Sequence, residues 1–131
     1  MAPKYSFQID PSRDLVRIVM SGLFMPVHVH EFFTARSIAH QALRCAPGDH
    51  VTLTDLRGLT MVPHDTIEAF AALLTHPQSR ARRIAFVVAP TLVRSQLLRA
   101  LDGRESGFFT DPVAAEAWLT RADAVRETAA A

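Results

Sequence analysis

The sequence has 131 residues, of which 49% are hydrophobic and 21% charged. This length fits one domain, and this apolar content excludes an intrinsically disordered chain. The 14 basic and 13 acidic side chains leave a net charge of +1, which excludes a histone-like or acidic-tail protein. We therefore expect a single domain over residues 1–131, with its core over about 5–120 and a flexible tail over 123–131.

The N-terminal third of the chain predicts a β-hairpin followed by a helix. Residues 5–9 alternate apolar and polar side chains as a half-buried strand does, and the run Leu15–Met20 is mostly β-branched or apolar. The segment between them is dense in turn formers. Pro26 suits the first turn of a helix that ends before residue 47. Its expected packing face, bordered by His28 and Arg36, consists of Phe32, Ala35, Ala39, Ala42, Leu43 and Ala46.

The rest of the chain predicts alternating strands and helices. Val51–Leu56 is a short strand, Arg57–Pro63 is a loop, and Asp65 has Glu68 at the spacing of a helix capping box. The continuous apolar run Arg83–Ala89 is typical of a strand that is covered on both faces. Further elements are expected as a helix over 92–101, a strand over 108–110 and a last helix over 113–120.

The predicted element order is β-β-α-β-α-β-α-β-α. Strand–helix alternation with short connections indicates parallel strands joined by right-handed crossovers. The expected fold class is therefore α/β, with a mixed four- to five-stranded sheet and helices mainly on one face. The residues expected to pack from the second and last helices are Ile67, Phe70, Leu73 and Leu74, and Val113, Ala117 and Trp118.

Three segments in this order carry a resemblance to a known family. They are the strand and loop Leu53–Val62, the strand Ile84–Pro90 with the helix after it, and the closing strand and helix Phe108–Leu119. Over about residues 5–120 the chain resembles the STAS domains of bacterial anti-sigma-factor antagonists and their small stand-alone relatives. The resemblance implies a non-catalytic regulatory module that binds a protein partner.

In that family the functional residue is a serine at the start of the second helix, within a pattern such as Asp-Ser-Ser-Gly. A kinase phosphorylates it, and the added charge breaks the complex with the partner. Counted from Asp55, this chain has His64 at the serine position, and the glycine is absent. Thr66 is an off-register hydroxyl. The expected binding residues are Asp55, Arg57, His64, Asp65 and Thr66; the alternative interpretation of His64 is an exposed loop histidine next to the helix start.

A basic cluster follows the second helix, with Arg80, Arg82, Arg83, Arg94 and Arg99 as its main members. It would suit an acidic partner, an anionic lipid or a phosphate, or it would simply be a solvated surface. It lacks interleaved aromatic residues, so we expect no nucleic-acid partner. Some apolar residues lie outside the expected packing faces or in the loop before His64, and they would give a protein partner or a second copy of the chain a surface to bind. They are Val27, Phe33, Ile38, Met61 and Val62.

The alternative function is binding of a small molecule or lipid within the same fold. In that case four phenylalanines would line a cavity of several hundred Å³ instead of filling a core: Phe24, Phe32, Phe70 and Phe86. A protein-binding module would instead show a filled core and a surface patch near His64.

We expect no enzyme activity, because nucleophile-elbow, dinucleotide-binding and phosphate-loop motifs are absent. His28 and His30 would point apart on a helix, so we expect no metal and no cofactor. Cys45 is the single cysteine. With neither a signal peptide nor a transmembrane segment predicted, the expected location is the cytoplasm.

Overall fold

The computed structural model describes residues 2–46, 48–59, 62–75, 81–89 and 106–120. Five strands form one sheet in the order β1-β2-β3-β4-β5. β1 (Lys4–Asp10) runs antiparallel to β2 (Leu15–Gly22), whereas β3 (Val51–Leu59), β4 (Arg83–Val87) and β5 (Ser106–Phe109) continue the sheet in parallel. The predicted α/β class with a mixed sheet is confirmed.

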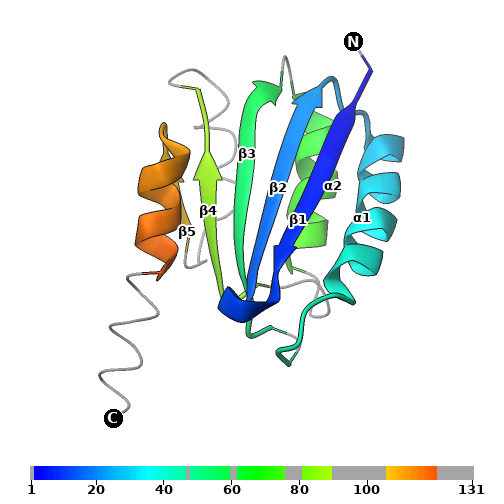
Figure 1. Cartoon of the computed structure of the whole chain (residues 1–131). Coiled ribbons are helices and arrows are strands. Elements are labelled where there is room, and N and C mark those ends of the chain that lie inside the picture. Colours follow the sequence, from blue (N-terminus) through cyan, green and yellow to red (C-terminus); the bar gives the residue numbers. More distant parts are fainter. Residues whose placement is uncertain (1, 47, 60–61, 76–80, 90–105, 121–131) are drawn as a thin grey trace.

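Helices cover both faces of this sheet unequally. Figure 1 shows α1 (Pro26–His40) and α2 (His64–Thr75) on one face, and a helix over 112–120 on the other face beside β4 and β5. We call the outer surface that α1 and α2 form on their side of the sheet the helical face. The expected helix over 92–101 and the expected tail over 123–131 lie outside the described residues.

β4 is buried from both sides, as its continuous apolar run predicts. Ile84 and Phe86 belong to the apolar cluster under α1 and α2, which also contains Val16, Ile18 and Met20 of β2. The alternate residues of β4 pack in a second cluster with the last helix; that cluster contains Leu15, Val51, Leu53, Ala85, Val87, Ala115 and Leu119. Strand alternation therefore divides one sheet between two apolar cores.

The packing face predicted for α1 is wrong in part. The helix ends at His40, and beyond it Ala42 and Ala46 are exposed. Its buried residues are Val29, Phe32 and Arg36, which follow one another at spacings of three and four and so share one helical face. A long aliphatic stem allows Arg36 to pack at the centre of this face.

The last helix packs against the sheet through a different face from the predicted one. Val113 is 73% exposed and Ala117 is exposed, whereas Ala115 and Leu119, four residues apart, are fully buried. Trp118 does pack, with its ring 5.6 Å from that of Phe109. The helix therefore packs Ala115 and Leu119 against the apolar residues of β2, β3 and β4.

β3 is longer than predicted and contains an irregularity that we call the β3 bulge. The expected loop from Arg57 is still strand as far as Leu59, and the register with β2 shifts between Val19↔Asp55 and Ser21↔Gly58. Two residues of β3 thus oppose one residue of β2. A side chain at Gly58 would approach the Cβ atom of Ser21 to 2.7 Å, so glycine allows the two strands to come this close.

Candidate functional site

The start of α2 places the predicted switch residue at the surface. The helix begins at His64, whose side chain is 85% exposed and whose Nε2 lies 3.2 Å from Oε1 of Glu68. Asp65 is therefore inside the first turn and not a cap ahead of it, and its carboxylate accepts a hydrogen bond from the backbone of Thr66 at 3.0 Å. Acidic residues in a first turn suit the positive end of the helix dipole.

Thr66 does not belong to this surface, which corrects its place among the expected binding residues. It is fully buried, and its hydroxyl donates a 2.8 Å hydrogen bond to the carbonyl oxygen of Phe24. This bond joins α2 to the segment between β2 and α1. A hydroxyl that is enclosed in this way is not accessible as a phosphate acceptor.

Replacing Thr66 by valine is expected to lower the free energy of unfolding by about 1–2 kcal/mol, because the buried carbonyl of Phe24 loses its donor. Urea unfolding followed by circular dichroism measures the change. Thr66→Ser keeps the hydroxyl and should retain the hydrogen-bond contribution. A loss of stability in Thr66→Ser with none in Thr66→Val would show that the methyl group, and not the hydrogen bond, is what stabilises the fold.

Asp55 and Arg57 lie on the sheet face opposite α1 and α2. The guanidinium of Arg57 donates to both carboxylate oxygens of Asp55, at 3.0 and 2.7 Å. Burial alone would raise the pKa of Asp55, but the hydrogen bonds and charge of Arg57 outweigh it and hold that pKa below its usual value. The sheet thus separates these two predicted site residues from His64 and Asp65.

Asp55 and Arg57 line a hollow of about 260 Å³ on that opposite face, which we call the sheet groove. Glu116 of the last helix lies in its wall and forms ion pairs with Arg13 and Arg17. The hydrogen bond from Arg17 is the main reason that the pKa of Glu116 is lowered. The acidic groups named here are therefore already paired within the chain.

A second hollow lies between α1 and α2 on the outside of the helical layer. We call it the helix groove; its volume is about 260 Å³, and it is lined by Val29, His30, Phe33, Ala69, Ala72 and Leu73. Val27 and Ile38 on α1 are 60% and 64% exposed, as their off-face positions predict. Val62, expected at the surface, is buried, and Met61 lies outside the described residues.

The core beneath the helical layer is filled by the phenylalanines that the ligand-binding alternative would need around a cavity. Phe24, Phe32 and Phe86 are each at most 3% exposed. The cavity that remains among the described core residues is about 40 Å³ and is lined partly by Phe70 and by the polar side chain of Thr52. This volume accommodates one or two water molecules and is far below the several hundred Å³ of a ligand pocket.

The predicted basic cluster is described only at Arg82 and Arg83. Arg82 donates from Nε to the carbonyl oxygen of Asp49 at 3.3 Å. The guanidinium of Arg83 lies 5.1 Å from the ring centroid of Trp118, within the range of a cation–π interaction. The other members, Arg80, Arg94 and Arg99, lie outside the described residues, so the cluster remains a prediction.

A pair of neighbouring histidines, one buried and one half-buried, is a feature that sequence reasoning missed. The rings of His40 and His50 lie 4.7 Å apart between centroids, and His50 is 3% exposed. Burial, with the nearby charge of Arg36, lowers the pKa of each histidine to about 4. Both imidazoles are therefore neutral near pH 7. The pairing could not be inferred from two histidines in different elements.

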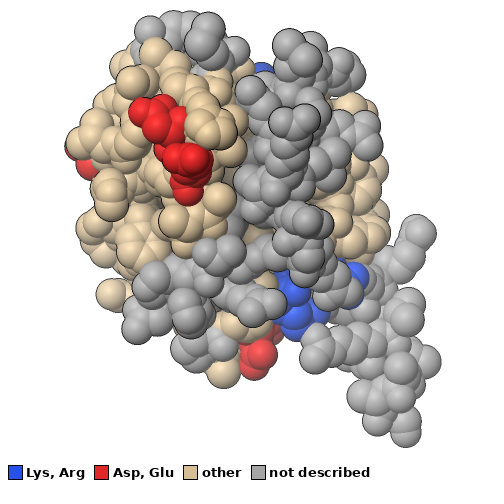
Figure 2. Space-filling model, turned by 180° about the vertical axis from the view of Figure 1, so that it is seen from behind, with Lys and Arg blue, Asp and Glu red and all other residues tan. Residues whose placement is uncertain are grey.

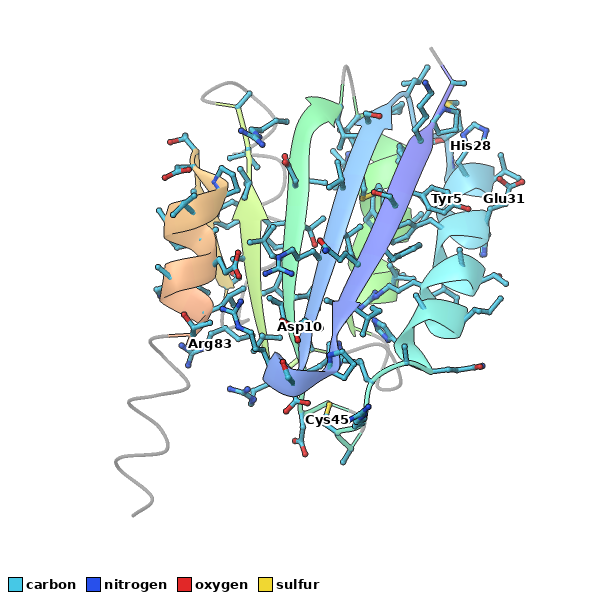
Figure 3. The ribbon with its side chains drawn as sticks, viewed as in Figure 1. Tyr5, Asp10, His28, Glu31, Cys45 and Arg83 are labelled. Carbon is cyan, nitrogen blue, oxygen red and sulfur yellow. The ribbon has the colours of Figure 1, made fainter. Side chains whose placement is uncertain are left out.

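Among the described residues, no three His, Cys, Asp or Glu side chains are grouped so that they could hold a metal ion. His28 and Glu31 are on the outer side of α1, whereas Cys45 lies in the loop at the other end of the helix (Figure 3). No described helix is long and apolar enough to cross a membrane.

Comparison with known proteins identifies the fold. A solved structure from Shewanella loihica PV-4, an uncharacterized protein of the DUF3478 family with a SpoIIAA-like fold, matches with a TM-score of 0.66. The two chains are 18% identical, and the match covers 91% of this chain and 96% of the other. This chain has a SpoIIAA-like fold. The resemblance to STAS domains is thereby confirmed for the fold. No family model and no curated protein matches the sequence.

Proposed function

We propose that this SpoIIAA-like chain is a non-catalytic regulatory module that acts by binding another protein through the helix groove and the adjoining start of α2. The observation that carries the proposal is the apolar hollow of about 260 Å³ between α1 and α2. Exposed apolar hollows of this kind are typical of surfaces that bury against a partner. The core, by contrast, retains a cavity of only about 40 Å³ among its described residues.

The state of the polar side chains supports a binding role over catalysis. Catalytic acids and bases need to reach a substrate, yet Asp55 is held by Arg57, and Glu116 by Arg13 and Arg17. These pairs orient charged groups toward one another. Such an arrangement stabilises the surface and supports recognition of a partner elsewhere, at the helix groove.

Among the predicted binding residues, His64 at the start of α2 is exposed where a partner in the helix groove would contact it. It stands where the STAS resemblance places a phosphorylated serine, and its side chain is 85% exposed beside Glu68. We propose that the complex is regulated without serine phosphorylation at this position. His64→Ala is expected to weaken partner binding while leaving the melting temperature nearly unchanged, because the imidazole makes no buried contact to lose.

A matched pair of alanine substitutions tests the proposed function. Ala72 lines the helix groove, and Ala117 is an equally exposed alanine in the helix on the opposite face. Ala72→Tyr fills the groove, whereas Ala117→Tyr adds the same side chain elsewhere at a similar cost in helix propensity. Affinity capture from the native cell, with the captured protein identified and rebound in purified form, is expected to fail with Ala72→Tyr alone. Equal capture by the two variants would contradict the proposal.

A further inference from the structure

We propose that the helix groove accepts a basic amphipathic helix, with one bulky apolar side chain in the hollow and Lys or Arg residues beside it. The inference rests on the proposed function and adds the chemistry of the partner. Helix-in-groove recognition uses an apolar anchor and its neighbours three or four residues away. The charge, size and shape of this groove each favour such an occupant.

Within the described part of the chain, the exposed charges of α1 and α2 are acidic. Glu31, Asp65 and Glu68 of α1 and α2 are exposed, whereas the only Lys or Arg in either helix is Arg36, which is 3% exposed. Figure 2 shows this side of the molecule: acidic side chains gather on its upper left part, and the basic side chains seen in this view lie mostly lower down, next to a further acidic side chain. A positively charged partner is therefore attracted to the upper part of the helical face.

Two of these acids stand at the edge of the groove itself. Asp65 precedes Ala69 by four residues, and Glu68 precedes Ala72 by four, so each carboxylate lies one turn above an alanine that lines the hollow. Glu31, by contrast, projects from the outer side of α1 (Figure 3). Cations on a bound helix would thus meet Asp65 and Glu68 before Glu31.

The groove has the size and shape for one anchor side chain. Its volume of about 260 Å³ exceeds the roughly 150 Å³ at which an apolar protein cavity accepts benzene. Ala69 and Ala72 are small and three residues apart on one wall, which lets another helix approach α2 closely. The opposite wall contributes Val29, His30 and Phe33 of α1. The lining is thus mostly apolar, with the charges at its edge.

The same charges disfavour the other occupants. Nucleic acid and anionic lipid carry negative charge toward Asp65 and Glu68. A symmetric dimer through this face would bring the acidic patch of one copy against the same patch of the other, since both partners of a two-fold interface use one patch. Like charges across an interface oppose association. A basic amphipathic helix is complementary to both the apolar hollow and its acidic edge.

Two dye-labelled helical peptides test the inference by fluorescence anisotropy with the full chain. Both carry the same leucine and tryptophan stripe, and the flanking positions are all lysine in one and all glutamate in the other. The lysine peptide is expected to bind saturably and at least about tenfold more tightly, which corresponds to roughly 1.4 kcal/mol. Its affinity should fall as salt is added, because exposed charges are screened.

Variants locate the binding on the groove. Glu68→Lys is expected to weaken the lysine peptide at least about fivefold, and Ala72→Tyr to abolish its binding. Glu31→Lys changes the net charge by the same amount but should have a clearly smaller effect, because Glu31 lies away from the groove. Equal effects of the two charge reversals, or equal binding of the two peptides, would overturn the inference.

The outcomes separate this inference from the proposed function. If neither peptide binds while capture of a protein still depends on Ala72, the basic-helix inference fails and the proposed function stands. If capture is also independent of Ala72, both fail. Concentration-dependent dimerisation that Ala72→Tyr removes, measured by sedimentation, would assign the groove to a second copy of the chain and overturn the inference.

Discussion

Lowering the pH from 7 to 5 is expected to remove about 3 kcal/mol from the free energy of unfolding through His40 and His50. Burial lowers the pKa of both to about 4. In the unfolded chain the histidine pKa values are near 6.5, so between pH 6.5 and 4 the unfolded chain binds protons that the folded chain does not bind. Stability is therefore lost as the pH falls through this range. The full shift would contribute roughly 2 kcal/mol per ring at pH 5; solvent near the partly exposed His40 reduces the sum.

The charges around the pair act in the same direction on balance. Desolvation is the largest cause for each ring, followed by Arg36. Arg82 lowers the pKa of His50 further, and Asp14 and Asp49 oppose this by smaller amounts. The two rings also repel each other when protonated, so the first proton to enter makes the second less favourable.

Urea unfolding at several pH values measures this dependence. The double variant His40→Gln, His50→Gln should flatten the slope between pH 6.5 and 4, while His64→Gln, at an exposed position, should leave the slope in place. Proton NMR of the native chain gives a second readout that needs no variant: the buried imidazole resonances should titrate near pH 4. Titration of both rings above pH 6 would contradict the burial that lowers them.

Replacing Phe32 by alanine is expected to cost about 4 kcal/mol of unfolding free energy, within the range for buried phenylalanines. The ring is 3% exposed and lies 5.4 Å from Tyr5, 5.5 Å from Phe7 and 6.1 Å from Phe70 between ring centroids. Its removal would both lose these aromatic contacts and enlarge the adjoining core cavity of about 40 Å³.

Chemical denaturation of the variant beside Phe32→Leu, which retains most of the volume, checks this expectation. The leucine variant should lose less than half as much as the alanine variant, because a smaller void remains. The experiment also decides between a filled core and the ligand-binding alternative. If Phe32 lined a ligand hollow, its truncation would cost less than about 1 kcal/mol and the alternative function would regain support.

The sheet could be predicted from the sequence because its strands depend on local patterns. Alternation in β1 and the continuous apolar run of β4 reflect one-sided and two-sided burial, and both are properties of neighbouring residues. The face of α1 was harder, because alanines suit buried and exposed positions alike. The sequence predicts Arg36 only at the border of that face, because a charged head group gives no sign that its stem is buried.

The candidate site depended on contacts that local patterns do not encode. Asp55 and His64 are nine positions apart, yet strand alternation and the turn into α2 place them on opposite sides of the sheet. The helix groove combines residues about forty positions apart, from α1 and α2. In the sequence Thr66 is an off-register hydroxyl near a helix start, and nothing local shows that its hydroxyl donates to the carbonyl of Phe24, 42 residues away. Such relations follow from the crossovers between parallel strands.

The β3 bulge affects how relatives should be aligned with this chain. Its additional residue lets Leu56 and Leu59 both face the core under α1 and α2, although strict alternation would turn one of them outward. In a homologue whose β3 lacks this bulge, α2 would begin one residue closer to the start of β3. Equivalence at His64 should therefore be assigned by superposing the first turn of α2, with a single-residue gap placed between Asp55 and Gly58, at Leu56 or Arg57.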